Sequence, residues 1–121
     1  MKYFTLEEFD SPDKPGSGKY MNEDFLEMLD CAREEANIPF KINSGYRTED
    51  KNNAIYKSLG KKPVKSSHLK GYAADIHCNN SQYRSIIVRA LINVGFTRLG
   101  ISSTFIHVDN DPDKVSAIWL Y

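Results

Sequence analysis

Apolar residues recur along the chain with a helical period in some segments and with a period of two in others. Over residues 22–36 the apolar positions return every three or four residues, which is the spacing of one face of an α-helix. These positions are Phe25, Leu29, Ala32 and Ala36. Asn22 is suited to cap this helix, and Asn37 and Pro39 are suited to stop it. The pattern therefore predicts a first helix over these residues.

Two further helices are predicted downstream. One follows Thr48, which is a suitable cap, and runs towards residue 59. The other covers about residues 82–94, with Ser81 as the expected cap and Gly95 as the stop. This last helix is rich in apolar residues, so we expect it to be well buried.

A period of two marks the strands. Over residues 71–78 apolar side chains fall on one face, whereas Asp75 and His77 fall on the other. Residues 104–109 repeat this design, again with a histidine and an aspartate opposite the apolar face. Shorter strands are expected over residues 40–43, 97–101 and 115–121. Helices that interleave with half-buried strands indicate an α+β fold, with the helices packed on a small, mainly antiparallel sheet.

The composition fits one soluble domain over residues 1–121. Lys and Arg together number 16, as do Asp and Glu, so the chain lacks the basic excess typical of nucleic-acid binders. No apolar run is long enough to span a membrane. Cys31 and Cys78 are too few for a disulfide framework, and we expect both to be free, buried thiols. A monomer is expected.

Three side chains that are distant in the sequence can converge on one point. If the strands over 71–78 and 104–109 are neighbours, Asp75 and His107 project from the same face of the sheet. His68 lies in a loop long enough to fold back over the first of these strands. Two imidazoles and one carboxylate are the ligands of a zinc site whose fourth position stays open for water. We therefore expect Zn²⁺ at these three residues, with His77 uninvolved.

The residues around the first ligand follow the pattern Ser66-x-His68-x-x-Gly71-x-Ala73-x-Asp75. Gly71 lets the chain turn sharply from the loop into the strand, and Ala73 leaves room beside Asp75. Ser66 has two interpretations. It binds the substrate, or it only orients the loop through hydrogen bonds between its side chain and the backbone.

This motif lies between a Ser-Gly-Tyr-Arg segment at residues 44–47 and a Phe-Ile-His-Val-Asp segment at residues 105–109. In this order the three segments resemble the zinc D-Ala-D-Ala carboxypeptidase family of peptidoglycan peptidases. That family includes the dipeptidases of vancomycin resistance and phage endolysins, and it shares its fold with the hedgehog signalling domain. The resemblance implies that the two histidines and the aspartate named above bind zinc. It also implies that Arg47 binds the substrate and stabilises the developing oxyanion, although a structural ion pair is the alternative for this residue.

The general base is where the sequence departs from the family. The dipeptidase and endolysin branches carry an acidic residue three positions before the last zinc histidine, where this chain has Thr104. A carboxypeptidase branch carries a histidine two positions before it, where this chain has Phe105. The chain most resembles a branch with His-x-Asp at the last ligand. Asp109 is therefore the expected catalytic carboxylate, either as the base or as a partner that orients His107.

The resemblance implies a zinc-dependent metallopeptidase that hydrolyses an amide bond in peptidoglycan stem peptides or cross-links, as a carboxypeptidase or as an endopeptidase. Thr104 keeps a second interpretation open, which is a zinc-containing cell-wall-binding module without catalytic activity. The His107-x-Asp109 pair also copies part of the facial triad of iron oxygenases, but no later histidine completes it.

The N-terminal residues 1–9 turn acidic where the apolar stretch of a signal peptide would continue. The sequence therefore predicts a protein that is cytoplasmic as synthesised. Action on the cell wall would then require release by a separate lysis system, as for a phage or prophage protein, or a leader that this chain lacks.

Overall fold

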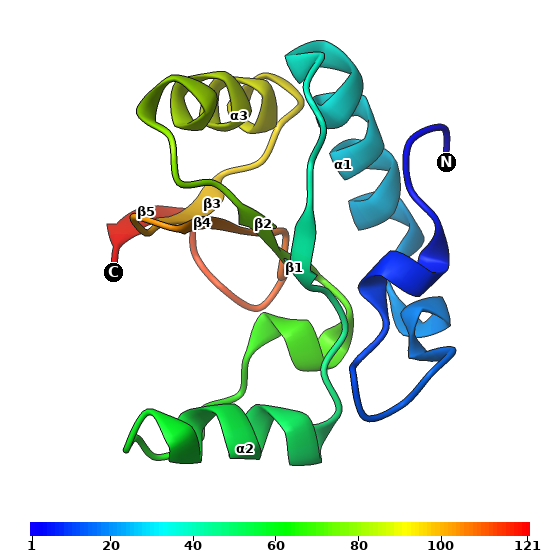
Figure 1. Ribbon diagram of the computed structural model, residues 1–121, viewed down its shortest axis with the longest axis vertical. Helices are drawn as coiled ribbons and strands as arrows, with labels where there is room; N and C mark the ends of the chain where they lie inside the picture. The colour runs from blue at the N-terminus through cyan, green and yellow to red at the C-terminus, as the bar shows by residue number, and fades with distance from the viewer.

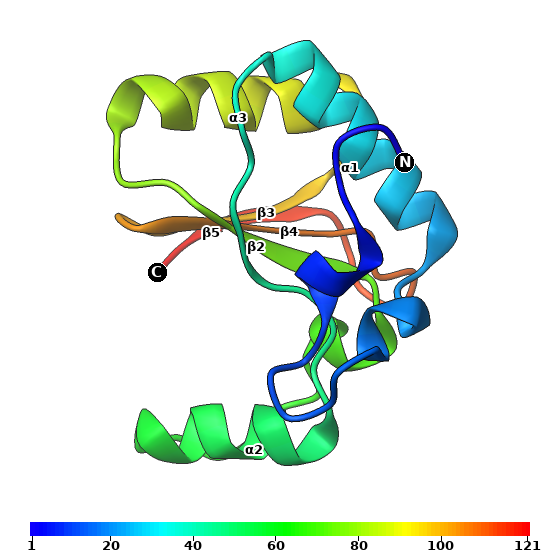
Figure 2. The same cartoon turned by 45° about the vertical axis from the view of Figure 1, so that its right-hand side comes forward.

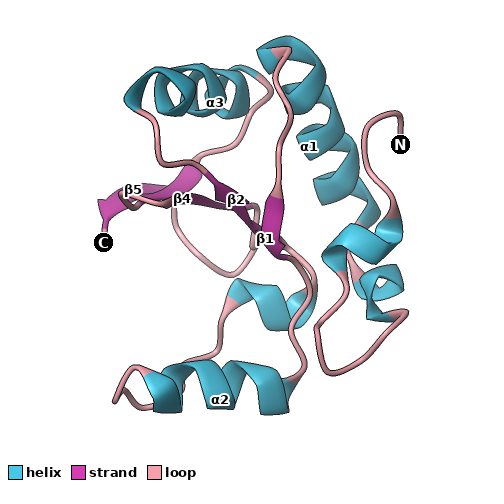
Figure 3. Cartoon of the chain, viewed as in Figure 1, coloured by secondary structure: helices cyan, strands magenta, loops and turns pink.

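The computed structural model describes residues 1–121 and contains three α-helices, three 3-10 turns and five strands. The helices are α1 (Glu23–Ala36), α2 (Glu49–Ser58) and α3 (Ser81–Asn93). The 3-10 turns are η1 (Leu6–Phe9), η2 (Ser17–Tyr20) and η3 (Ser67–Lys70). The strands are β1 (Ile42–Ser44), β2 (Ala73–His77), β3 (Arg98–Ile101), β4 (Phe105–Asp109) and β5 (Ala117–Leu120). These elements confirm the predicted α+β class, as Figure 3 shows by colour.

The five strands form one sheet in the order β1-β2-β4-β3-β5. All neighbours are antiparallel except β3 and β5, which are parallel. The register places Asp75 of β2 directly opposite His107 of β4, and His107 opposite Gly100 of β3. The predicted neighbourhood of the two strands that carry Asp75 and His107 is therefore confirmed, and the two side chains share a face because paired residues point the same way.

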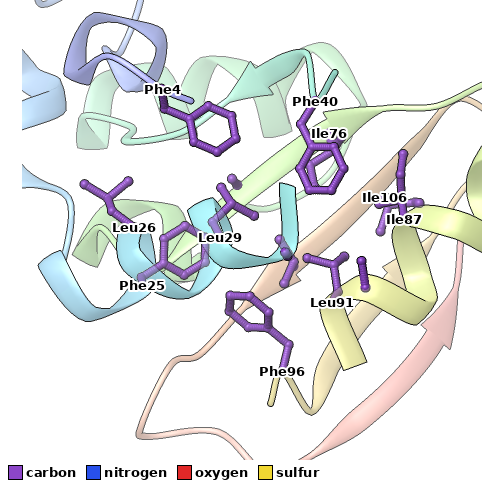
Figure 4. Packing of buried hydrophobic residues seen from close by; sticks show 14 of the residues in the cluster. Phe4, Phe25, Leu26, Leu29, Phe40, Ile76, Ile87, Leu91, Phe96 and Ile106 are labelled. Carbon is purple, nitrogen blue, oxygen red and sulfur yellow. The ribbon is translucent and has the colours of Figure 1, made fainter. Parts of the chain in front are cut away.

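The helices lie on opposite sides of the sheet. Figures 1 and 2 show α1 and α3 on one side, and α2 with the short turn η3 on the other. The main hydrophobic core lies between the sheet and the α1–α3 pair, as Figure 4 shows. Its fully buried members include Phe25 and Leu29 of α1, Leu91 of α3, and Ile76 and Ile106 of the sheet. The other face of the sheet carries the polar side chains of Asp75 and His107 together with the aromatic side chains of Phe105 and Trp119.

The helix ends follow the capping residues that the sequence offers, with one correction. The Asn22 side chain accepts a hydrogen bond from the backbone N–H of Phe25, as predicted for a cap. Thr48 caps α2 in the same way. For α3 the prediction was wrong by one residue. Asn80 is the cap, because its Oδ1 atom accepts from two backbone N–H groups, and Ser81 is the first helical residue.

Two predictions about burial were also wrong. Helix α3 buries only one side, and Ile86 and Ile92 remain 38% and 47% exposed, because the helix packs on α1 and the sheet alone. Cys31 of α1 is exposed, whereas Cys78 is buried as expected, and both are free thiols. No helix in the chain is both long enough and apolar enough to cross a bilayer.

Candidate metal centre

The floor of the site is the pair of side chains that face each other across β2 and β4. His107 Nδ1 lies 3.0 Å from Asp75 Oδ1. Both side chains are largely buried, with His107 9% and Asp75 13% exposed. The alternation of the two strands produces this arrangement, because Ile76 and Ile106 point into the core and force their neighbours to the opposite face.

The turn η3 brings His68 to the same point. The Ser66 hydroxyl caps this turn by accepting a hydrogen bond from the His68 backbone N–H at 3.2 Å. Gly71 ends it with φ of 78°, and a Cβ there would lie 2.3 Å from the backbone oxygen of Tyr20. Glycine is therefore required both by conformation and by the close approach of another segment. The loop folds back over β2 as predicted, and His68 Nε2 lies 3.3 Å from Asp75 Oδ1.

Hydrogen bonds fix the ring nitrogens of both histidines. His68 Nδ1 lies 2.7 Å from the carbonyl oxygen of Gly45, to which it must donate, so Nε2 of the neutral ring carries a lone pair. His107 Nε2 donates to Asp109 Oδ2 at 2.7 Å, which leaves Nδ1 turned towards Asp75. Outer partners of this kind are typical of metal-ligating histidines.

The three donor atoms fit a divalent ion. One ligand atom from each of His68, Asp75 and His107 can be chosen so that all lie within 4.8 Å of one another. A tetrahedral zinc site with bonds of about 2.0–2.1 Å separates its ligand atoms by roughly 3.3 Å. The distances of 3.3 Å and 3.0 Å from Asp75 Oδ1 to the two histidine nitrogens are close to that separation. A neutral His68 also presents a lone pair to a carboxylate oxygen, which a cation between them would satisfy.

The electrostatics of the cluster suit metal binding. Burial lowers the pKa of His68, and this effect outweighs the neighbouring Asp75 carboxylate. Burial acts in the same direction on His107, but its hydrogen bonds to Asp109 and Asp75 prevail and raise its pKa. Burial would raise the pKa of Asp75, yet the two imidazoles hold it well below its usual range. The centre thus offers an ionised carboxylate and a neutral imidazole, and a metal must displace one proton from His107.

Arg47 lies beside the centre. Its Nη2 is 3.2 Å from Asp75 Oδ2, and its Nε donates to the hydroxyl of Ser44 at 3.0 Å. The side chain is 12% exposed and lines the cleft described below. The structural ion pair considered for Arg47 in the sequence is therefore present. The role of Arg47 towards a substrate stays a prediction.

Asp109 is fully committed to contacts within the protein. Its Oδ1 accepts from Arg98 Nε at 2.7 Å and from the backbone N–H of Asp111 at 3.2 Å, while its Oδ2 accepts from His107. Its side chain is only 1% exposed. Of the two roles predicted for Asp109, these contacts favour the orientation of His107, because action as a base would require this carboxylate to give up one of these partners.

The remaining residues singled out in the sequence lie as follows. Thr104 is exposed, whereas Phe105 lines the cleft with its ring centroid 5.0 Å from that of Tyr121. His77 is exposed at the end of β2 and lies outside the metal cluster. Ser66 lines the cleft while it caps η3, so the structure keeps both of its interpretations open.

A cleft of about 590 Å³ opens over the metal cluster. On one side it is lined by apolar side chains from α2 and the following loop, and on the other by aromatic side chains of the sheet. The apolar and aromatic lining residues are Ile55, Tyr56, Leu59, Val64, Phe105, Trp119 and Tyr121. The lining cations are Arg47, Lys61, Lys65, Arg98 and Lys114, and the only lining carboxylates are Asp75 and Asp109. The cleft is therefore cationic in a chain whose net charge is zero.

Sequence reasoning missed a second buried carboxylate. Asp111, whose side chain is 0% exposed, accepts from the Ser67 hydroxyl at 2.8 Å and from Lys70 Nζ at 3.1 Å. Lys70 thus ties η3 to the segment that follows β4. The signal available was an aspartate two residues beyond Asp109, but its partners lie more than forty residues away.

A family model described as Peptidase M15 matches residues 2–109 of the chain. The chain therefore belongs to the Peptidase M15 family, a family of metal-dependent peptidases, and the family resemblance seen in the sequence motifs is confirmed. The match spans all three predicted metal ligands and ends at Asp109, so strand β5 lies beyond it. No curated protein matches the chain.

Proposed function

We propose that the protein is a zinc-dependent peptidase that hydrolyses an amide bond in peptidoglycan stem peptides or cross-links. The observation that carries the proposal is the convergence of His68, Asp75 and His107 on one point at the wall of an open cleft, with the outer nitrogens of both histidines already hydrogen-bonded. Membership of the Peptidase M15 family supplies the class of reaction. The identity of the metal and of the bond are the parts proposed here.

The chain's own residues divide the work. His68, Asp75 and His107 would hold the ion, which when bound polarises a carbonyl and lowers the pKa of water. Asp109 keeps His107 in the orientation and tautomer that binding needs. Arg47, whose guanidinium is held by Asp75 and Ser44, would donate to the oxygen of a scissile carbonyl and stabilise its growing negative charge.

The charge of the cleft supports a substrate that carries carboxylates. Arg47 and Arg98 are paired with Asp75 and Asp109, but no side-chain partner neutralises Lys61 or Lys65. Stem peptides of peptidoglycan are rich in free carboxylates, and an excess of cations at the mouth of a cleft raises the local concentration of such molecules. Action at the cell wall is part of the same proposal.

A binding module without catalysis is the second candidate, and one observation favours it. Asp109 has no free oxygen, Thr104 and Phe105 carry no carboxylate or imidazole, and no further carboxylate lines the cleft beyond those already paired. A domain that retained the metal and the cationic cleft without a free proton acceptor would bind stem peptides and leave them intact.

The test is incubation of the zinc-loaded protein with soluble muropeptides, followed by mass spectrometry of the products. We expect a new fragment whose mass identifies the cleaved amide bond. The same incubation with chelator-stripped protein and with a His107→Gln variant should give none. Muropeptide binding without a fragment would establish the binding module instead. Neither binding nor cleavage by zinc-loaded protein would overturn the cell-wall proposal.

A further inference from the structure

Strand β5 brings an indole ring up to a predicted metal ligand. The ring centroid of Trp119 lies 5.4 Å from that of His107, and the two planes are inclined by 46°. Gly100 of β3 is the register partner of both residues, so the indole reaches the imidazole across a strand position that has no side chain. A Cβ at Gly100 would lie 2.6 Å from Trp119 Nε1 and 2.7 Å from a ring carbon of Tyr121. Glycine at position 100 is therefore needed for the rings of Trp119 and Tyr121 to lie over this strand.

A second contact links the same indole to the carboxylate that orients His107. The guanidinium carbon of Arg98 lies 4.9 Å from the Trp119 ring centroid, within the range of a cation–π contact. Arg98 Nε donates to Asp109 Oδ1, and Asp109 Oδ2 accepts from His107 Nε2, each at 2.7 Å. Trp119, Arg98, Asp109 and His107 thus form a closed circuit of contacts around one side of the centre.

Arg98, Asp109 and His107 lie within the residues that match the family model, whereas Trp119 lies beyond them. We infer that Trp119 is a positioning residue for the metal, which holds His107 directly through ring packing and indirectly through Arg98 and Asp109. Without the indole, the imidazole has open space on the Gly100 side, and Arg98 loses one of the contacts that order it while it keeps those to Asp109 and to the Val115 carbonyl. Metal affinity should fall because the ligand must then be ordered when the ion binds.

The inference rests on the proposed metal centre, and its test measures metal binding without any peptidase assay. The apo-protein is titrated with Zn²⁺ in competition with a chromophoric chelator, and the visible spectrum of the Co²⁺ form reports the ligand geometry. We expect Trp119→Ala to weaken Zn²⁺ binding by about tenfold or more, the range typical of outer partners of metal ligands. The Co²⁺ spectrum should change as well, and Trp119→Phe should recover part of the affinity.

Ile118→Ala is the matched control. Ile118 lies on the same strand, points to the opposite face and is 61% exposed, so its variant should bind Zn²⁺ as the wild type does. Gly100→Ala tests the same circuit from the other strand, because the added methyl group must displace the indole. We expect it to weaken Zn²⁺ binding while circular dichroism shows an intact fold.

Wild-type affinity together with an unchanged Co²⁺ spectrum in folded Trp119→Ala would overturn the inference. If that variant does not fold, the same result in Trp119→Phe and Gly100→Ala together would overturn it. A wild-type protein that binds no Zn²⁺ would overturn the proposed function along with the inference, whereas normal wild-type binding with unaffected variants would overturn the inference alone.

Discussion

The two faces of the central sheet are built from the same strands but are held by different forces. On the core face, Ile76, Ile106 and Val108 are completely buried in the cluster that α1 and α3 share with the sheet. On the metal face, Asp75 and His107 alternate with these residues and are almost as inaccessible. Apolar packing tolerates many neighbours of suitable volume, whereas a buried carboxylate or imidazole requires a partner at each polar atom. The core face therefore supplies most of the folding free energy. The metal face, which carries Asp75 and His107, fixes the relative positions of the proposed ligand atoms.

On the metal face, almost every buried polar atom finds its hydrogen-bond partner in another group of the protein. Asp75 uses one oxygen for the two histidines and the other for Arg47. Asp109 uses both oxygens as well. A net hydrogen bond contributes only about 1 kcal/mol to folding, so this ordering adds little stability compared with the core. Substitutions on the metal face should therefore change metal affinity with little loss of stability, and substitutions on the core face should do the reverse.

The largest effect is expected from loss of a metal ligand. His68→Ala removes one of three donor atoms and should weaken Zn²⁺ binding by more than about 100-fold, beyond the range of outer-partner substitutions. His77→Ala is the matched control, because it removes the one histidine outside the cluster, which is exposed on the same face. Metal analysis after dialysis, with thermal unfolding of both variants, separates the two. Equal zinc contents would contradict the assignment of the centre.

A core substitution should give the opposite result. Ile106→Ala leaves a cavity beneath the metal face and should lower the free energy of unfolding by about 2–5 kcal/mol. Urea unfolding of the apo-protein measures this loss. Zinc affinity of the folded fraction should change by less than about threefold, because the neighbours of Ile106 keep their hydrogen bonds. An affinity loss as large as that of His68→Ala would show that the two faces are not independent.

The smallest effect is a dependence of stability on acid pH. Burial would raise the pKa of Asp111, but the backbone N–H of Asp113, the Ser67 hydroxyl and Lys70 lower it to about 2. Because the folded pKa is below the unfolded one, the stabilisation is present above about pH 4 and is lost as pH falls towards 2. Unfolding of apo wild type and Asp111→Asn should therefore differ by about 1–2 kcal/mol at pH 6 and by much less near pH 2. The same difference in unfolding free energy at pH 6 and near pH 2 would contradict the stabilising role of the ionised Asp111 carboxylate.

Local pattern was enough to predict most of the fold and the convergence of the three proposed metal ligands. Alternation in β2 and β4 placed Asp75 and His107 on one face, and the spacing to His68 allowed the loop to return. The site residues that were missed, Asp111 and Trp119, depend on long-range pairing. Trp119 reaches His107 only because β5 pairs in parallel with β3, an arrangement that the period of two does not encode. The Asn80 cap was missed because two adjacent residues were equally suited to the position.

Asp75, His107, Gly100 and Trp119 occupy a single row across four strands. A register shift of β2 or β4 by one residue would turn the side chains of that strand to the opposite face of the sheet. The shifted strand would expose its isoleucine, Ile76 or Ile106, to solvent. It would also move Asp75 and His107 apart. A register shift that disrupts the proposed metal centre would therefore also expose the hydrophobic core. The packing of the core face thus fixes the strand register on which the centre depends.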